Sequence, residues 1–295
     1  MHTEPFVYER PADLREMERL LARHAGEAHL LAGGTDLMVL VKEKVLSPRV
    51  LIDIGHVREL SWIAWDPGNG LSIGAGTKVA EIESHPAVKE HAPALAFAAA
   101  QLGSVQVRHM ATMAGNVCHA SPSAETPPVL LAHDAELTLA REGGQRTLPI
   151  SAFFLSYRKT ALEPGEYLKA FRLPPLPPRS AVAYRFRGLR QAMEIDMVNV
   201  GCYLELEEDL RTARAVRIAL GAVGPIPYRA VDAEKALAGR EVDEAFIEEA
   251  GRMAADEARP IDDVRASAAY RRKMVRVLVR RALRGCLDQI RRQEA

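Results

Sequence analysis

The first part of the chain alternates between short apolar runs and amphipathic segments, which predicts strands separated by helices. Runs rich in branched and aromatic residues at 6–10, 28–34 and 49–54 are typical of strands. Between them, apolar residues recur at the spacing of one helix face: Leu14, Met17 and Leu21, then Leu37, Leu40 and Val41. Thr35 and Asp36 are capping residue types for the second helix. We expect a small α/β unit that binds a ligand at the carboxyl end of a strand.

Residues 58–173 follow a less regular pattern, which predicts a second α/β unit. The sequence indicates a strand at 70–76, an alanine-rich buried helix at 93–103, and a hairpin at 135–150 whose turn is a Gly-Gly pair. The stretch 103–128 shows neither helical nor strand periodicity and has few charges. We therefore expect it to be a long, ordered and functional loop.

The stretch PPLPPRS, at 174–180, is the clearest linker, because consecutive prolines block both helices and strand pairing. Three strand-like runs and then three helix starts follow it: 181–189, 197–206 and 213–223, then Val231, Asp243 and Ser267. This order predicts an antiparallel sheet followed by a helical layer. The expected fold is therefore α+β, with boundaries that give units at 1–57, 58–173 and 181–295.

Composition and charge narrow the class of protein. The 295 residues include 39 Lys plus Arg and 39 Asp plus Glu, and this zero net charge argues against binding nucleic acid or an anionic membrane. Cys118, Cys202 and Cys286 are far apart and odd in number, so we expect neither a disulfide framework nor a metal site. No stretch approaches the roughly 20 apolar residues that span a bilayer. We expect a soluble, cytoplasmic chain without membrane insertion.

A glycine-containing stretch, LAGGTDL at 31–37, carries the first candidate chemistry. Gly33 and Gly34 follow a strand and leave main-chain N–H groups open to a ligand, while the helix that begins near Asp36 directs its positive end to the same place. Such a place suits a pyrophosphate. The G-x-G-x-x-G and P-loop fingerprints are absent, and a plain strand-to-helix turn would use glycine as well.

A second stretch, ATMAGNVCHASP, offers more small donors inside the expected loop: Thr112, Gly115, Asn116, Ser121 and Ser123. The two stretches look like two halves of one anion or cofactor cradle, a pattern more specific than either half. We expect the Thr112 and Asn116 side chains to hydrogen-bond the cofactor. A valine at Gly33 or Gly34 is expected to block the cofactor while the chain stays folded.

No catalytic constellation stands out, so we name no catalytic residue. His109 and His119 flank the second stretch and are expected to be surface or hydrogen-bonding residues, and Cys118 to be a small buried hydrophobe. Glu163 and Glu166 flank the turn EPGE, where we expect exposure. This absence fits a protein whose cofactor carries the redox chemistry.

Four segments resemble, in this order and spacing, the FAD-binding subunit of molybdenum-containing hydroxylases: LAGGTDLMVLVKEK, VRHMATMAGNVCHASPSAETPPVLLAHDAELTLA, LEPGEYLKAFRLPP and YRFRGLRQAMEIDMVNVGCYLEL. That family includes xanthine dehydrogenase and the medium chain of carbon monoxide dehydrogenase. The resemblance covers nearly the whole chain. It implies a PCMH-type FAD-binding domain of two α/β subdomains, followed by a C-terminal α+β domain of the CO dehydrogenase flavoprotein type.

The resemblance also implies which residues hold the FAD. The first stretch would wrap the pyrophosphate and the second would close over it, with Leu168 beside the isoalloxazine ring. The full set is Leu31, Ala32, Gly33, Gly34, Thr35, Asp36, Leu37, Thr112, Ala114, Gly115, Asn116, His119, Ser121, Glu125, Leu168 and Arg187. Two positions depart from the family pattern. Ala114 stands where a glycine is frequent, and the lysine usual near Arg187 aligns better with Phe186.

The family resemblance implies an electron-transfer role. A [2Fe–2S] subunit would take electrons from a molybdenum-cofactor subunit and pass them to FAD. FAD would then pass them to NAD, a quinone or oxygen. The implied assembly is a dimer of heterotrimers, that is, a heterohexamer. Two alternatives remain: a free-standing FAD-dependent oxidoreductase of PCMH fold, and a scaffold subunit without flavin. The lack of an acid/base pair speaks against the first, and the intact glycines speak against the second.

Overall fold

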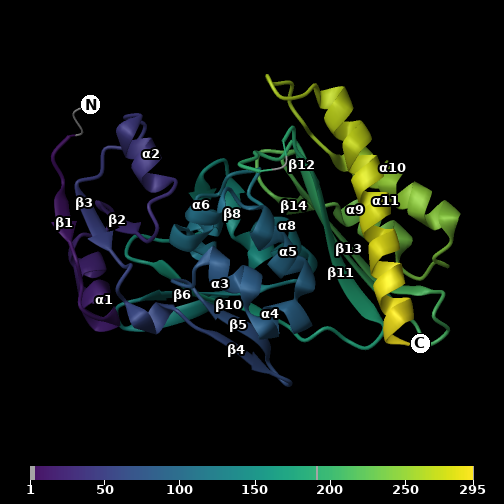
Figure 1. The fold of residues 1–295 in the computed structure, drawn as a ribbon, viewed down its shortest axis with the longest axis horizontal. Helices are drawn as coiled ribbons and strands as arrows, with labels where there is room; N and C mark the ends of the chain where they lie inside the picture. The colour runs from purple at the N-terminus through teal and green to yellow at the C-terminus, as the bar shows by residue number, and fades with distance from the viewer. Residues whose placement is uncertain (1–3, 191, 295) are drawn as a thin grey trace.

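The computed structural model describes residues 4–190 and 192–294, and its units follow one another from left to right in Figure 1. The first unit contains β1 (Val7–Glu9), α1 (Leu14–Arg23), β2 (Ala28–Leu31), α2 (Leu37–Lys42) and β3 (Val50–Asp53). Its three strands are parallel in the order β1-β3-β2. The central strand is the apolar run predicted as a strand at 49–54, and Val50, Leu51 and Ile52 are buried.

The two helices of this unit begin differently. Asp13 caps α1 by accepting a hydrogen bond from the N–H of Glu16, and Met17 and Leu21 are buried as their spacing predicts. For α2 the capping prediction is wrong, since Asp36 lies at the helix start but its side chain makes no capping hydrogen bond. The Asp36 carboxylate is half-exposed and turned towards the second unit.

The second unit is built on an antiparallel sheet of order β4-β5-β10-β6-β7. Its strands are β4 (Ile63–Asp66), β5 (Gly70–Gly74), β6 (Glu136–Arg141), β7 (Gly144–Pro149) and β10 (Tyr167–Leu173). A 3-10 turn (Arg58–Leu60) precedes the sheet, and a second one (Ile150–Ala152) leads into the small pair β8 (Phe154–Ser156) and β9 (Lys159–Thr160). The predicted hairpin is confirmed, because β6 and β7 pair, but its turn is formed by Glu142 and Gly143, since Gly144 already belongs to β7.

Six helices follow β5 and pack beside this sheet: α3 (Val79–Ser84), α4 (Pro86–His91), α5 (Pro93–Gln101), α6 (Val105–Met110), α7 (Met113–Cys118) and α8 (Thr126–Ala132). The alanine-rich helix is α5, and it is buried as predicted. The prediction of a long loop at 103–128 is wrong, because α6, α7 and the start of α8 occupy it. Ser104 and Thr112 cap α6 and α7.

The third unit begins after the proline-rich stretch, and its elements match the predicted order of strands and helices. They are β11 (Ser180–Arg187), β12 (Val198–Leu206), β13 (Ala213–Gly221), β14 (Tyr228–Arg229), α9 (Val231–Leu237), α10 (Glu244–Glu257) and α11 (Ala268–Gln293). The four strands are antiparallel in chain order. Asp243 and Ser267 cap α10 and α11. With this sheet and its helical layer, the predicted α+β class is confirmed.

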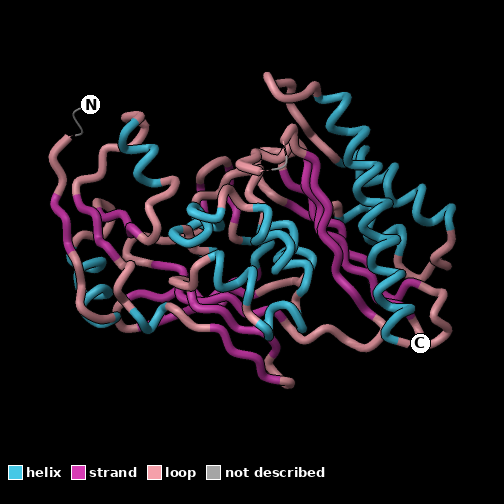
Figure 2. The backbone as a smooth tube through the Cα atoms, viewed as in Figure 1, coloured by secondary structure: helices cyan, strands magenta, loops and turns pink. Residues whose placement is uncertain are grey.

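The sheet of the third unit has helices on both faces. Side chains alternate along each strand, so one face of β11 and β12 presents Val182, Tyr184 and Tyr203 to the core of the second unit. The opposite face packs against α9 and α11, and α10 packs on these helices, in a separate core. Helices α5 and α8 therefore lie between two sheets, as Figures 1 and 2 show.

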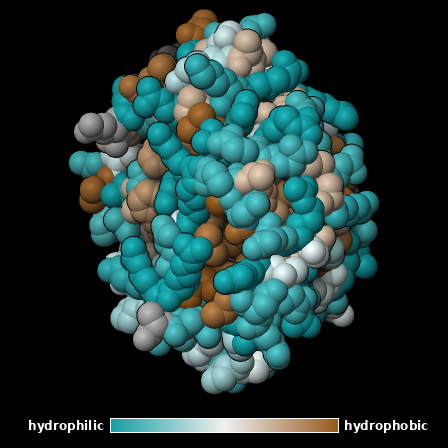
Figure 3. Space-filling view, turned by 90° about the vertical axis from the view of Figure 1, so that its right-hand side faces the viewer, coloured by the Kyte–Doolittle hydropathy of each residue, from teal (hydrophilic) through white to brown (hydrophobic). Residues whose placement is uncertain are grey.

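The outer helix α11 is rich in arginine and has a buried apolar stripe: Val275, Val279, Ala282, Cys286 and Ile290. Ion pairs join its solvent side to α10, among them Arg280 with Glu248 and Arg284 with Glu244. Seen from this end of the molecule, the surface is mostly hydrophilic, with a hydrophobic strip in its middle (Figure 3). No helix among the described residues is long and apolar enough to cross a membrane.

Candidate functional site

The two stretches of small residues meet at the junction of the first and second units. A Cβ atom at position 33 would lie 2.0 Å from the carbonyl oxygen of Met110 and 2.9 Å from Cα of Ala111. Gly33 therefore allows the turn after β2 to approach the backbone that leads into α7. Segments almost eighty residues apart in sequence are thus in direct contact.

A second contact joins the same stretches. Nε2 of His119, which follows α7, lies 3.8 Å from a carboxylate oxygen of Asp36 at the start of α2. Burial lowers the pKa of the His119 imidazole, and the nearby Asp36 opposes this shift. His119 thus lies beside Asp36 at the junction, and its side chain is mostly covered.

Backbone donors accumulate at this junction. Within residues 4–190 and 192–294, the N–H groups of residues 33 to 36 have no hydrogen-bond acceptor, and neither do those of Met113 and Ala114 in the first turn of α7. Adjacent free N–H groups form concave sites that bind anions. The junction therefore offers backbone donors from both stretches to a negatively charged ligand.

The structure changes how substitutions at the two glycines are to be interpreted. Because Gly33 lies against the Met110 carbonyl, a valine there would push the two units apart in addition to blocking a ligand. Gly34 has a φ of +69°, which a branched residue adopts only with strain. A valine at position 33 is therefore expected to disturb the contact between the two units as well as to block the cofactor.

Both polar atoms of the Asn116 side-chain amide form hydrogen bonds within the protein. Its Nδ2 donates to Glu125 at 3.2 Å, and its Oδ1 accepts from the hydroxyl of Thr126 at 2.7 Å. Burial raises the pKa of Glu125 to about 8, and the buried Asp196 adds to this effect. Glu125 is thus largely uncharged at neutral pH, and the bond from Asn116 holds its orientation.

A polar cluster in the third unit, which the sequence did not predict, contacts the backbone next to Glu125. The Asp196 carboxylate accepts from the hydroxyl of Tyr184 at 3.0 Å and from Nδ2 of Asn199 at 2.9 Å. Asn199 also donates to the carbonyl of Ala124, the residue before Glu125. Burial raises the pKa of Asp196 to about 6. The only sequence signal was polar residues within an otherwise apolar strand.

Thr112 has a structural role in addition to its predicted one. Its side chain is almost fully buried, and its Oγ1 accepts a hydrogen bond from the N–H of Gly115 at 3.0 Å. The residue also forms an antiparallel bridge with Lys78. Its hydroxyl is therefore engaged in capping α7, which places Gly115 at the junction.

The remaining predicted residues of the first two units lie around this junction. Ala32 and Thr35 are half-buried in the turn between β2 and α2, Leu31 ends β2, and Leu37 begins α2. Ser121 accepts from the N–H of Ser123 in the turn before α8.

Two predicted residues are farther from the polar contacts. Leu168 is buried in β10 and belongs to the same hydrophobic core as Met113 and Val117 of α7. Arg187 is exposed at the end of β11, and within the described chain no hydrogen bond or ion pair links its side chain to the other predicted residues. The neighbouring Phe186 stacks on Tyr184 instead.

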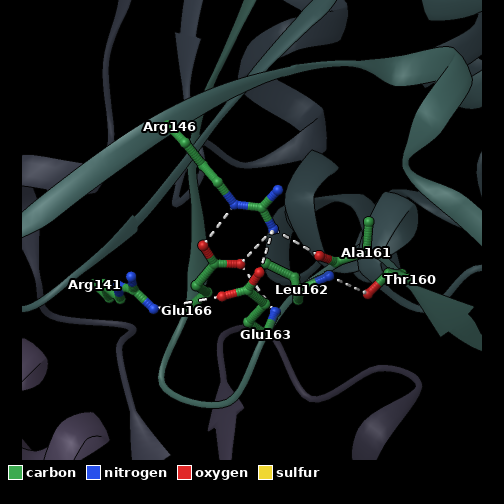
Figure 4. Close-up of polar contacts among 7 residues, drawn as sticks. All are labelled: Arg141, Arg146, Thr160, Ala161, Leu162, Glu163 and Glu166. Atoms are coloured by element: carbon green, nitrogen blue, oxygen red, sulfur yellow. Dashed lines mark hydrogen bonds and ion pairs between the residues drawn. The ribbon is translucent and has the colours of Figure 1, made fainter.

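An ion-pair cluster fixes the turn that leads into β10 (Figure 4). Nε and Nη2 of Arg146 bind the two carboxylate oxygens of Glu166 at 2.7 and 2.8 Å, and Nη2 also donates to the carbonyl of Ala161. The predicted exposure holds for Glu163 and is wrong for Glu166, whose carboxylate is nearly buried. Arg146 lowers the pKa of Glu166. The cluster holds the start of the strand that carries Leu168.

Comparisons with known proteins place these features in a family. Residues 4–176 match the family described as "FAD binding domain in molybdopterin dehydrogenase", and residues 175–286 match "CO dehydrogenase flavoprotein C-terminal domain". The chain belongs to this family of FAD-binding subunits. FAD is therefore its cofactor, and the chain is an oxidoreductase subunit.

Individual relatives match along nearly their full length. The chain is 33% identical over 282 residues to the carbon monoxide dehydrogenase medium chain of Hydrogenophaga pseudoflava, covering 94% of this chain and 96% of that one. It is 29% identical to the xanthine dehydrogenase FAD-binding subunit of Escherichia coli O157:H7, covering 94% of each. A solved carbon monoxide dehydrogenase from H. pseudoflava superposes with a TM-score of 0.91 at 30% identity, covering 97% of this chain and 98% of that chain.

The residues at the junction suit the FAD of this family. A diphosphate is an anion, and the free N–H groups of residues 33 to 36 and of Met113 and Ala114 are donors for an anion. The absence of a Cβ at Gly33 lets the first stretch lie against the backbone of Met110, which brings the two stretches together. Among the described residues, no group of three or more His, Cys, Asp or Glu side chains could hold a metal ion.

Proposed function

We propose that this chain binds one FAD noncovalently at the junction of the two glycine stretches. The observation that carries the proposal is the meeting of these stretches, with Gly33 against Met110 and unpaired backbone N–H groups on both sides. In this proposal the first stretch and the start of α7 hold the diphosphate. Glu125 and Leu168 lie towards the isoalloxazine ring, and Arg187 contributes least because it is exposed.

The full set of sixteen predicted cofactor residues remains part of this proposal. The bound FAD would supply reversible two-electron and one-electron chemistry. Asn116 orients Glu125, Thr112 caps α7 so that Gly115 faces the ligand, and the buried Asp196 cluster fixes Glu125 from the third unit. The proposed units are 1–57 and 58–173 for FAD and 181–295 for the C-terminal domain.

The chain's proposed partners are a [2Fe–2S] subunit and a molybdenum-cofactor subunit, in a dimer of heterotrimers. Electrons would arrive from the iron–sulfur subunit and leave to NAD, a quinone or oxygen, and the assembly would work in the cytoplasm. Support comes from relatives named as medium chains or FAD-binding subunits of dehydrogenases. Their names describe components of larger enzymes, which is the role proposed for this chain.

The visible spectrum of the purified chain tests the cofactor proposal. We expect a flavin spectrum, and we expect acid or heat denaturation to release one FAD per chain into the supernatant. A chain that is folded and colourless, and that takes up no added FAD, would favour the flavin-free scaffold. Turnover of an organic substrate by the isolated yellow chain would favour a free-standing oxidoreductase.

A further inference from the structure

Lys78 lies at the same junction, although no prediction included it. The residue follows β5 and directly precedes α3, and its Nζ donates to the carbonyl oxygen of Met110 at 3.0 Å. This is the carbonyl against which Gly33 packs. The N–H of Val79 donates to the carbonyl of Ala111, and Lys78 bridges Thr112, so the backbone of both segments is fixed. Lys78 is therefore held where the two glycine stretches meet.

The charge of Lys78 is only partly compensated. Its side chain is half-buried, and burial lowers the pKa of its ammonium group, while Glu81 and Asp53 oppose this from a greater distance. Within the described chain, no carboxylate lies within 4.0 Å of its Nζ. Asp53 is already bound, since its carboxylate accepts from the hydroxyl of Tyr8 and from the N–H of Gly55.

An ammonium group has three N–H donors, and a single carbonyl uses one of them. A partly desolvated cation without an adjacent anion is costly, and binding an anion removes that cost. The first glycine stretch, which packs against the same Met110 carbonyl, carries backbone N–H groups without an acceptor among the described residues, and these also favour an anion. A cation and free amides thus converge on the place that the cofactor's diphosphate is proposed to occupy.

We propose that the ammonium group of Lys78 binds the diphosphate of FAD and is a binding residue of this site. The inference rests on the proposed function, since it needs FAD at this junction. A purely structural role would be to tie Met110 to the second unit. The two roles differ in their dependence on ligand charge, because a structural tie affects every flavin and a diphosphate contact affects only those with phosphates.

The test compares FAD with riboflavin, which has the isoalloxazine ring and no phosphate. Apoprotein of the full chain is titrated with each ligand, as wild type, as Lys78→Gln and as Lys89→Gln. Lys89 is exposed on α4 and provides a matched loss of one charge. We expect Lys78→Gln to weaken FAD binding about ten-fold or more, because a charge-assisted bond is lost, and to leave riboflavin binding unchanged. Lys89→Gln should change neither.

Each other outcome overturns one specific statement. Wild-type apoprotein that does not bind FAD overturns the proposed function. Lys78→Gln that binds FAD like wild type, or that loses FAD and riboflavin equally, overturns the role of Lys78 alone.

A measurement on the wild type covers the case in which the variant fails to fold. Trace acetylation of lysines is followed by mass spectrometry with no ligand, with FAD and with riboflavin. FAD should protect Lys78, riboflavin should not, and Lys89 should stay reactive throughout. Equal reactivity of Lys78 with and without FAD would overturn the proposal.

Discussion

At the scale of single residues, side chains first predicted as cofactor ligands turn out to organise one another. The types were predictable from sequence: glycine for close approach, and threonine, asparagine and serine as small donors. Their partners were not, because the bonds of Asn116 to Glu125 and Thr126 and the contact of Gly33 with Met110 depend on how distant segments fold together. The proposed role of the half-buried Lys78 could not be predicted from the sequence, because it depends on where the fold places this residue.

The raised pKa of Glu125 makes stability depend on pH. Its carboxyl group has a pKa of about 8 in the folded chain against an ordinary value of 4.5, so between these values the folded state binds an extra proton. The unfolding free energy of wild-type apoprotein, relative to Glu125→Gln, should therefore fall as pH rises from about 4.5 to about 8. The slope should not exceed roughly 1.4 kcal/mol per pH unit.

Denaturant titrations across this pH range measure that difference. Glu142→Gln, an exposed change in the hairpin turn, is the control and should give a flat difference from wild type. A difference between wild type and Glu125→Gln that does not vary with pH would contradict the burial of a protonated Glu125.

Loss of the Thr112 cap should destabilise the chain. Thr112→Val removes the acceptor for the N–H of Gly115, and the unfolding free energy should fall by about 1 kcal/mol. Thr112→Ser retains the hydroxyl and should keep most of the stability. A Thr112→Val variant as stable as wild type, together with a loss in Thr112→Ser, would show that the methyl group's packing, and not the cap, is what matters.

At the scale of elements, strong periodicity and capping residues made most predictions correct. The apolar run of β3, the alanine-rich α5 and the starts of α10 and α11 at Asp243 and Ser267 all follow from local pattern. The two helices in 103–128 were missed because each spans six residues, too few for a helical period to be visible. Ser104 and Thr112, as capping residue types, were the available signal.

Close packing of α8 on β12 joins the second and third units, and it leads to a test. A Cβ at Gly201 would lie 2.2 Å from the carbonyl oxygen of Pro128. Gly201→Ala should therefore lower the unfolding free energy by about 1–3 kcal/mol, through overpacking. Gly144→Ala, where no atom lies within 4 Å, should change it by no more than about 0.5 kcal/mol. Similar thermal unfolding of both variants would refute this contact.

At the scale of the whole molecule, the order of strands and helices along the chain followed from the sequence pattern, and the boundaries of the units stay a prediction. How the units pack on one another could not be predicted. The second and third units share a core, since Val182, Tyr184 and Tyr203 of the C-terminal sheet join the residues around α5 and α8. Alternating side chains on those strands were visible in the sequence, but not which helices would cover each face.

The isolated chain should be an electron carrier without substrate chemistry of its own. Loaded with FAD, it should turn over small carbonyl, purine or aromatic substrates far more slowly than roughly 1 per second. A tagged copy expressed in its native host should bring down two companion chains. Rapid turnover by the chain alone would contradict the subunit role.

Hydrogen–deuterium exchange of the full-length apoprotein with and without FAD tests the central claim most directly. The claim is that the cofactor lies where the two glycine stretches meet, with backbone N–H groups of residues 33 to 36 and of Met113 and Ala114 as donors. Peptides that cover 31–37 and 112–119 should both exchange more slowly when FAD is added, and the surface of α11 should not change. FAD binding that protects neither stretch, or only one of them, would contradict this account.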